Sequence, residues 1–361
     1  MTRVRFPELA CYGLAGHTER PLDVVAEARL AEQMGIGSIF LSERFTCKDA
    51  GVMAGAVAAT TERLGIATAA TNHQTRHPLV TATMAVTAHR MSEGRYAFGL
   101  GRGFDLLFDV MGVPRSTSAS MADAIGIYRR LWAGEAFGHA GPAGSYPFLS
   151  QDSSFDERIP VLSMAIGDNS LAQAGRLADG VVLHTFMTDR TVARAVDIVR
   201  SAAQDAGRDP ASVRIWSVLA TVEDSLPEQA RLRKLVGRLA TYLQGYGAVL
   251  VRANDWDADV LERFAADPAV TGHAGALDAT GSTEQLRDIR DRLLPEEWLG
   301  ASATGTAEQC AARIADQLDA GADSVVLHGA TPTELAPVVA AWATRRPATL
   351  NALPANPGRI S

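Results

Sequence analysis

One local pattern recurs along the chain: an Ala-rich stretch with helical spacing ends near a glycine, and a β-branched run and a polar residue follow. It reads LAEQMGIGSIFLSE at 30–43, AGRLADGVVLHT at 174–185 and LDAGADSVVLHG at 318–329. A helix between strands is the connection that parallel strands require, because a tight hairpin joins only antiparallel ones. The pattern therefore predicts an α/β protein with a parallel sheet.

The strand candidates are short and almost continuously apolar, which is typical of parallel strands that are covered on both faces. Eight such strands that alternate with helices indicate a (β/α)8 TIM barrel, with a doubly wound open sheet as the competing architecture. The strand candidates lie at 8–14, 36–42, 65–71, 95–101, 160–166, 180–185, 213–222 and 323–328. The helix candidates lie at 20–34, 50–62, 78–91, 119–133, 169–178, 188–206 and 306–320.

We expect a single barrel domain over residues 1–345, because α/β barrels of this length commonly form one domain. Residues 134–158 are rich in Gly, Ser and Pro and predict an excursion loop. Residues 225–300 are too long for one connection and predict an insertion over the C-terminal face of the barrel. Residues 346–361 are rich in Pro and Asn and predict a loose tail.

Within the insertion, helix-like runs surround 227–247 and 256–266, and a Gly-rich loop is expected at 268–282. This segment carries no motif that identifies a substrate. Its predicted position over the C-terminal face implies that it shapes the substrate pocket.

Composition excludes several classes of partner. The formal net charge is −7 and no basic run is mixed with aromatic residues, so nucleic acid is not an expected partner. No apolar run approaches the 18 residues of a membrane span, and the N-terminus is a poor signal peptide. The cysteines, Cys11, Cys47 and Cys310, are far apart and form no CxxC, which favours a reduced, cytoplasmic setting.

Polar residues gather where predicted strands end, and in a barrel these positions line the active site. Ser42, Glu43 and Arg44 follow the second strand. The stretch GLGRG at 99–103 ends the fourth strand, where glycines allow close approach of a ligand or simply a tight turn. The spacing is not that of a dinucleotide fingerprint, and no GxSxG or P-loop motif occurs.

Residues 71–78 read TNHQTRHP, with His73 and His77 four residues apart. Pro78 belongs in the first turn of a helix, so the two histidines precede that helix instead of sharing one of its faces. No carboxylate accompanies them, and we predict no metal site. His77 is read as a helix-entry residue, and Arg76 is expected to pair with an acid.

Gly167, Asp168 and Asn169 begin the helix after the fifth strand, where unpaired N–H groups suit a phosphate. A plain N-cap by Asp168 or Asn169 is the alternative reading. Glu43 and Arg44 have a similar pair of readings. They could form a surface ion pair, or they could act on a bound ring and on developing charge.

The segment LGIATAATNHQTRHPLVTATMAVTAHRMSEGRYAFGLGRGF at 64–104 resembles the signature region of the bacterial luciferase-like superfamily. It is most similar to the branch of coenzyme F420-dependent oxidoreductases of the methylenetetrahydromethanopterin reductase type. GIGSIFLSERF, the strand 5–helix–strand 6 unit and the last helix and strand also resemble that family, so the likeness covers residues 8–345.

The resemblance implies a deazaflavin across the C-terminal mouth of the barrel, against a bulge in the third strand with a non-prolyl cis peptide at Ala69–Ala70. It implies a phosphate site at Ala165, Ile166 and Gly167, with Thr185 nearby. The cofactor-binding residues implied in this way are Ser42, Glu43, Ala69, Ala70, Thr71, Asn72, Arg102, Ala165, Ile166, Gly167 and Thr185.

Two positions depart from the family pattern. Arg44 stands where related sugar-phosphate dehydrogenases have a catalytic histidine, and Phe104 stands where they have a glutamate, so that activity is not expected. Glu43 and Arg44 are therefore predicted to tune the ring or the substrate, and His17 or His73 to move a proton.

The sequence thus predicts an F420-dependent oxidoreductase that transfers a hydride between the deazaflavin C5 and a small organic substrate. An FMN-dependent monooxygenase of the same fold and a non-catalytic deazaflavin- or flavin-binding barrel are the alternatives. A homodimer is implied by the resemblance alone.

Overall fold

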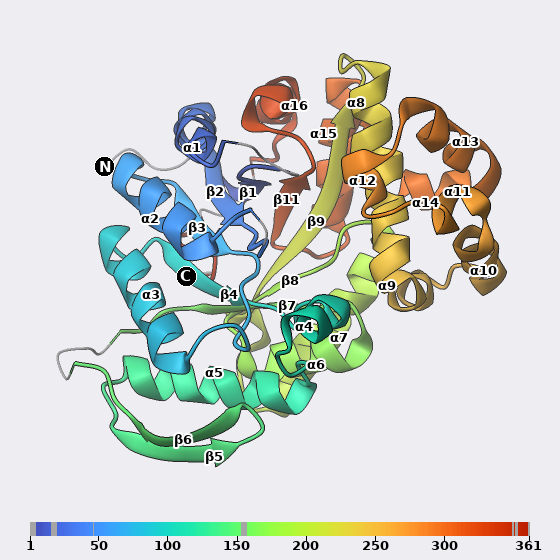
Figure 1. Ribbon diagram of the computed structural model, residues 1–361. Helices are drawn as coiled ribbons and strands as arrows, with labels where there is room; N and C mark the ends of the chain where they lie inside the picture. The colour runs from blue at the N-terminus through green and yellow to red at the C-terminus, as the bar shows by residue number, and fades with distance from the viewer. Residues whose placement is uncertain are drawn as a thin grey trace.

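The computed structural model describes residues 5–15, 20–45, 47–152, 157–348, 350 and 353–359. Among these residues, eight parallel strands close into a barrel with helices around it (Figure 1). The order around the ring is β9-β11-β1-β2-β3-β4-β7-β8, and pairing of β8 with β9 completes it. The predicted (β/α)8 barrel is therefore confirmed, and the open sheet is excluded.

All eight predicted strands are present, and their ends differ from the expected ones by at most three residues. They are β1 (Phe6–Tyr12), β2 (Ile36–Leu41), β3 (Gly65–Thr68), β4 (Tyr96–Leu100), β7 (Val161–Met164), β8 (Gly180–Val182), β9 (Arg214–Glu223) and β11 (Ser324–His328). A short strand, β10 (Ala303–Gly305), extends the sheet beside β9.

Side chains of unequal size fill the interior of the barrel. Phe40 and Trp216 pack edge to face with ring centroids 5.0 Å apart, and both are fully buried. Ala10, Ala67 and Ala97 from neighbouring strands belong to the same buried cluster and leave room for these rings. The barrel is thus a packed core, and any ligand site has to lie at its ends.

The helices of the repeat cover the outside of the barrel. They are α1 (Asp23–Met34), α2 (Ala50–Thr60), α3 (Pro78–Met91), α5 (Ser118–Trp132), α6 (Asp168–Leu177), α7 (Asp189–Asp205), α15 (Ala307–Asp319) and α16 (Pro332–Arg345). The short α4 (Asp105–Met111) follows β4, and a 3-10 turn, η1 (Pro210–Ser212), precedes β9. Of these elements, α4, η1 and α16 were not among the predicted helices. At the start of α16 the Thr331 side chain accepts from the amide of Glu334, and Pro332 occupies the first turn.

The predicted loop at 134–158 is wrong in its first half. Residues 137–149 form an antiparallel hairpin of β5 (Phe137–Gly141) and β6 (Gly144–Leu149), which lies against α5 in Figure 1. Asp123 of α5 accepts hydrogen bonds from the amide of Ala143 at 2.8 Å and contacts Nε2 of His139 at 2.9 Å. Contacts to a distant helix therefore fix a hairpin that local composition did not indicate.

The insertion is helical and gathers on one side of the barrel (Figure 1). Its elements are α8 (Glu228–Leu232), a π-helical turn η2 (Arg233–Gly237), α9 (Arg238–Asn254), α10 (Ala258–Ala266), α11 (Pro268–Thr271), α12 (Leu277–Thr280), α13 (Thr283–Leu293) and α14 (Glu296–Gly300). It has an apolar core of its own, in which Trp256 and Trp298 stack with centroids 4.6 Å apart. The loop expected at 268–282 contains two of these short helices, so that expectation is corrected.

The prediction of a loose C-terminal tail is wrong for residues 353–359. Arg214 is fully buried at the start of β9 and donates hydrogen bonds to the carbonyls of Pro354, Asn356 and Arg359. Trp216 donates through Nε1 to the carbonyl of Pro357 at 2.8 Å. The tail closes the amino-terminal end of the barrel, because its carbonyls are the acceptors that a buried guanidinium needs.

Among the described residues, no helix is both long enough and apolar enough to cross a membrane.

Candidate active site

The third strand ends in a bulge that places backbone at the mouth of the barrel. The peptide bond Ala69–Ala70 is cis, as the resemblance implied. The amide of Ala69 donates to Leu41 on one side at 2.8 Å, and the amide of Thr71 donates to Gly99 on the other at 3.0 Å. A Cβ at Gly99 would lie 1.7 Å from the carbonyl oxygen of Thr68, so glycine is required for this close approach.

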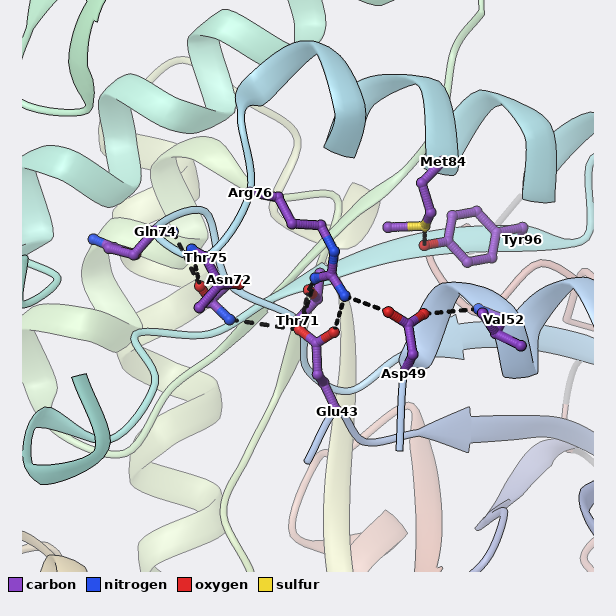
Figure 2. Close-up of polar contacts among 10 residues, drawn as sticks. All are labelled: Glu43, Asp49, Val52, Thr71, Asn72, Gln74, Thr75, Arg76, Met84 and Tyr96. Atoms are coloured by element: carbon purple, nitrogen blue, oxygen red, sulfur yellow. Dashed lines mark hydrogen bonds and ion pairs between the residues drawn. The ribbon is translucent and has the colours of Figure 1, made fainter. Parts of the chain in front are cut away.

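An ion pair joins the loops that follow β2 and β3 (Figure 2). Both carboxylate oxygens of Glu43 accept from the guanidinium of Arg76, and Thr71 Oγ1 donates to Glu43 Oε2 at 2.7 Å. Arg76 also donates to Asp49 Oδ2 at 2.6 Å. Only 4% of the Glu43 side chain is exposed. The prediction that Arg76 pairs with an acid is confirmed.

The ion pair places Glu43 differently from the surface reading. One of the two readings paired Glu43 with Arg44 at the surface; in the structure Glu43 is buried and forms an ion pair with Arg76, from the loop after β3. Its carboxylate is occupied by Arg76 and Thr71, so the structure assigns it the role of holding the two strand ends together. Its direct contact with a cofactor stays a prediction.

Asn72 and His73 lie in the loop that follows β3. Asn72 Oδ1 accepts from the amides of Gln74 and Thr75, both at 3.0 Å, and its amide nitrogen lies 3.5 Å from Glu43. His73 is buried, Nδ1 has no hydrogen-bond partner, and burial lowers the pKa of this imidazole. A buried ring with an unpaired nitrogen keeps His73 available as a site residue.

His77 is the N-cap of α3, where Nδ1 accepts from the amide of Leu79 at 3.3 Å, with Pro78 in the first turn. The helix-entry reading is therefore confirmed. Among the described residues, no group of three or more His, Cys, Asp or Glu is placed to hold a metal ion.

The loop after β2 borders a pocket of about 440 Å³, lined by Glu43, Arg44, Phe45, Cys47, Lys48, Asp49, Thr75, Arg76 and Met111. Arg44 therefore faces a cavity. Lys48 Nζ donates to the carbonyl of Leu14 at 2.8 Å and to Ser42 Oγ at 3.3 Å. His17, predicted as a proton-transfer residue, lies outside the described residues.

The start of α6 offers backbone donors without a side-chain cap. Gly167 is the N-cap, and a Cβ built there would have only Val249 within 4 Å, at 3.9 Å. Asp168 forms an ion pair with Arg194 and does not cap the helix, so the plain N-cap reading is wrong. Ala165 and Ile166 lead into this turn, and it has the N–H groups that bind an anion.

Thr185, after β8, is linked to the other side of the mouth. Its Oγ1 lies 2.8 Å from Nδ1 of His328, at the end of β11. Arg238 of α9 lies 3.4 Å from His328 Nε2. Because a guanidinium only donates, Nε2 is the accepting nitrogen, and Nδ1 carries the proton that Thr185 accepts. The Thr185 hydroxyl hydrogen is then left to donate to another group.

Aromatic rings from the strand ends and from the insertion form one wall of the mouth. Tyr12 lies 4.6 Å from His328, and Tyr242 of α9 lies 4.6 Å from His184, measured between ring centroids. Tyr246 is 5.7 Å from His184. Burial lowers the pKa of His184 to about 4 and that of His328 well below its usual value. Both imidazoles are therefore neutral near pH 7.

The segment between β4 and α5 crosses the same region. Phe104 packs against Tyr246 of α9 at 5.6 Å, and Phe108 packs against Phe45 of the loop after β2 at 6.2 Å. Arg102 donates to the carbonyl of Ser116 at 3.1 and 2.8 Å, so its guanidinium holds this segment. Its contact with a cofactor stays a prediction.

Sequence reasoning missed the residues that the insertion contributes, namely Arg238, Tyr242 and Tyr246. It also did not single out Lys48, although this is one of only two lysines in the chain, the other being Lys234. That scarcity is a signal that the sequence already contained.

The fold and the site define a class of protein: a (β/α)8 barrel with a helical insertion and a ligand site at the carboxyl ends of its strands. The sequence matches the family model of luciferase-like monooxygenases over residues 8–324. The chain belongs to the luciferase-like monooxygenase family. This membership confirms both the resemblance and the prediction of an enzyme.

Two curated relatives illustrate the family. The 5,10-methylenetetrahydromethanopterin reductase of Methanolobus tindarius is 27% identical over 309 residues, which cover 84% of this chain and 89% of the relative. The F420-dependent glucose-6-phosphate dehydrogenase of Beutenbergia cavernae is 31% identical over 179 residues, which cover 45% of this chain and 52% of the relative.

Solved structures share the fold. The coenzyme F420 dependent tetrahydromethanopterin reductase from Methanopyrus kandleri superposes with a TM-score of 0.75 at 19% identity, over 94% of this chain and 98% of that one. An F420-dependent secondary alcohol dehydrogenase, solved with an F420-acetone adduct, gives a TM-score of 0.69 at 17% identity, over 92% and 96%.

Proposed function

We propose that this protein is an F420-dependent oxidoreductase that transfers a hydride between the deazaflavin C5 and a small organic substrate. Support comes from the relative that is 27% identical over most of both chains, a reductase of methylenetetrahydromethanopterin. The second curated relative is named as F420-dependent, and so are both structural neighbours described above.

The observation that carries the proposal is the start of α6. It has no side-chain cap, and Asp168 points to Arg194. The space beside Gly167 is open apart from Val249. Thr185 has a hydroxyl hydrogen to donate. These donors fit a phosphate, which the side chain of a deazaflavin carries, so Gly167 and Thr185 would hold that end of the cofactor. Ala165 and Ile166 are proposed to position this turn, because their amides already donate to the carbonyl of Val182 and to Ser170 Oγ.

The other end would lie against the bulge at Ala69–Ala70. A Cβ at Gly101 would lie 3.0 Å from the Cβ of Ala70. The small residues at these two positions therefore leave space for a flat ring beside the bulge. Ser42, Thr71, Asn72 and Arg102 are the further residues proposed around the cofactor.

When bound, the deazaflavin supplies the hydride chemistry. The chain's own residues bind, orient and exclude water. The Glu43–Arg76 pair fixes the ends of β2 and β3. The wall formed by Tyr12, His184 and Tyr242 is half-buried, and partial exclusion of water strengthens electrostatic effects at the reacting atoms. Arg44 is proposed to stabilise developing negative charge, while His73 and His17 stay candidates for moving a proton.

A cofactor titration tests the proposal. Tryptophan fluorescence should be quenched by F420 at micromolar concentration, and reduced FMN should not compete. Tighter binding of FMN than of F420 would favour the alternative of an FMN-dependent monooxygenase. Binding of F420 with no substrate-dependent change in its absorbance at 420 nm would favour the non-catalytic barrel.

We also propose a homodimer on the strength of the family resemblance. Light scattering of the purified protein at micromolar concentration checks it, and the mass of a single 38.2 kDa chain would contradict it. A cytoplasmic location stays a prediction.

A further inference from the structure

The chain uses arginine for almost all of its positive charge. Of its 34 lysines and arginines, only Lys48 and Lys234 are lysines. An arginine holds its proton throughout the physiological pH range, whereas a buried lysine can release one. A cationic side chain that releases and regains a proton near neutral pH is therefore expected at one of the two lysine positions.

The two lysines differ in their surroundings. Lys234 donates to Glu334 and to the carbonyl of Gly329, both at 2.9 Å, which is a structural ion pair at the base of the insertion. Lys48 is only 5% exposed, and Nζ donates to the carbonyl of Leu14 and to Ser42 Oγ. These residues directly follow β1 and β2, so the Lys48 ammonium lies at the mouth of the barrel.

Charged and titratable groups face Lys48 from several elements. Arg44 and Cys47 lie in the same loop as Lys48, Glu27 lies on α1 and Arg238 lies on α9. The charge of Lys48 also acts on His328 of β11, whose pKa it lowers. Glu27 accepts from the amide of Leu14 at 2.6 Å, so it supports the peptide whose neighbouring carbonyl Lys48 binds. Burial, then Arg44, lowers the pKa of Lys48 to about 8, while Cys47 and Glu27 act to raise it.

The other candidates at the mouth are less suited to delivering a proton near neutral pH. Arg44 does not release its proton. His184 and His328 are neutral because of burial, and burial also lowers the pKa of His73, the candidate named above. Glu43 is held by Arg76 and Thr71. The Lys48 loop, in contrast, borders the pocket of about 440 Å³, on the same side as Arg44.

We propose that Lys48 is the proton-transfer residue of this enzyme and that the substrate is a carbonyl compound, whose reduction needs a proton on oxygen. In the reductive direction a hydride adds to the carbonyl carbon and forms a C–H bond, and the π electron pair moves to oxygen. An N–H bond of the Lys48 ammonium breaks and its proton passes to that oxygen, which gives an alcohol. The neutral amine then regains a proton from water.

The proposal rests on the proposed function, because the two electrons come from the reduced deazaflavin. It goes further in naming the acid and the substrate class. An arginine at this position would supply the same positive charge but would not release a proton, so the amine fits a residue that transfers one.

The first test uses the cofactor-free protein. Growth on [ε-13C]lysine labels two side chains, and the variant Lys48→Arg identifies the resonance of Lys48. We expect that resonance to titrate near pH 8, more than two pH units below the about 10.4 of an ordinary lysine. Titration of Lys48 at the ordinary value would overturn the proposal.

The second test measures F420H2 oxidation with a panel of carbonyl probes: acetone, cyclohexanone and benzaldehyde. Lys48→Arg and Lys48→Ala should each lose about 100-fold or more in turnover, with F420 affinity within threefold of wild type. Ethylamine added in solution should raise the turnover of Lys48→Ala by at least about tenfold. Lys234→Arg, the matched control, should keep its turnover.

The outcomes separate the two proposals. If wild-type protein does not bind F420, the proposed function fails, and the role of Lys48 in it fails as well. If F420 binds and Lys48→Arg turns over as wild type, only the assignment of Lys48 is wrong. If F420 binds but no carbonyl probe is reduced by wild type, the carbonyl assignment is overturned.

Discussion

Arg76 and Glu43 form an ion pair that connects the loops after two neighbouring strands, with Arg76 Nη1 3.1 Å from Glu43 Oε2. The carboxylate is 4% exposed, whereas the guanidinium is 24% exposed and also reaches Asp49. The pair holds the backbone on both sides of the candidate cofactor edge. The loss of either partner should therefore affect stability as well as the site.

Arg76→Ala should lower the free energy of unfolding by about 3 kcal/mol, because it leaves the Glu43 carboxylate buried without its cation. Urea unfolding followed by circular dichroism measures it. Arg115→Ala is the matched control: Arg115 pairs with Asp109 on the surface, where solvent screens the pair, so its removal should change the free energy of unfolding far less. Equal losses in the two variants would contradict the structural role of the Arg76 pair.

Arg44→Ala should reduce turnover far more than cofactor affinity, by about 100-fold against less than threefold, if Arg44 stabilises charge that develops during the reaction. Steady-state kinetics and F420 titration provide the two numbers. A parallel loss of turnover and affinity would show that Arg44 binds the cofactor instead.

His184 makes stability depend on pH. Its pKa is lowered to about 4 by burial, whereas the unfolded chain has a value near 6.5. The unfolded state binds the proton more tightly, so stability is complete above pH 6.5 and falls as the pH drops toward 4. The difference between the two pKa values of His184 corresponds to a loss of about 3 kcal/mol in the free energy of unfolding once the pH is below both. In His184→Gln the free energy of unfolding in urea should change less between pH 7 and 5 than it does in the wild type. If the pH dependence is the same in both proteins, this histidine is not its cause.

Gly99→Ala should destabilise the protein by more than about 3 kcal/mol, because its Cβ would overlap the carbonyl of Thr68 on the neighbouring strand. Gly126→Ala is the control within α5, where nothing lies within 4 Å of the added Cβ. That substitution should stabilise by about 0.5–1 kcal/mol through helix propensity. Thermal melts of both variants give the comparison.

Removal of residues 350–361 should destabilise the barrel by about 3 kcal/mol, because Arg214 then loses three of its carbonyl acceptors inside the structure. Arg214→Met in the full-length chain and in the truncated chain completes a double-mutant cycle. A coupling energy near zero would mean that the tail acts through other contacts.

The pattern of helix, glycine and β-branched run at three places, together with short apolar runs at the others, was sufficient to predict the barrel, since the eight barrel strands are almost entirely buried. The strand ends also predicted Glu43, Thr71 and Thr185 near the mouth, because parallel strands bring their carboxyl ends to one side. The cis bond at Ala69–Ala70 came from the family resemblance.

What the sequence could not determine depends on contacts between distant segments. The partner of Glu43 is Arg76, and three of the acceptors of Arg214 lie 140 to 145 residues away in the tail. The hairpin at 137–149 depends on Asp123 in α5. Periodicity along the sequence indicates which face of a helix or strand is buried. The partner of a buried charge, in contrast, depends on which other element the fold places beside it. For that reason the sequence alone determined the barrel and the side of it that carries the site, and only the tertiary structure decided that Lys48, Arg238 and Tyr242 meet there.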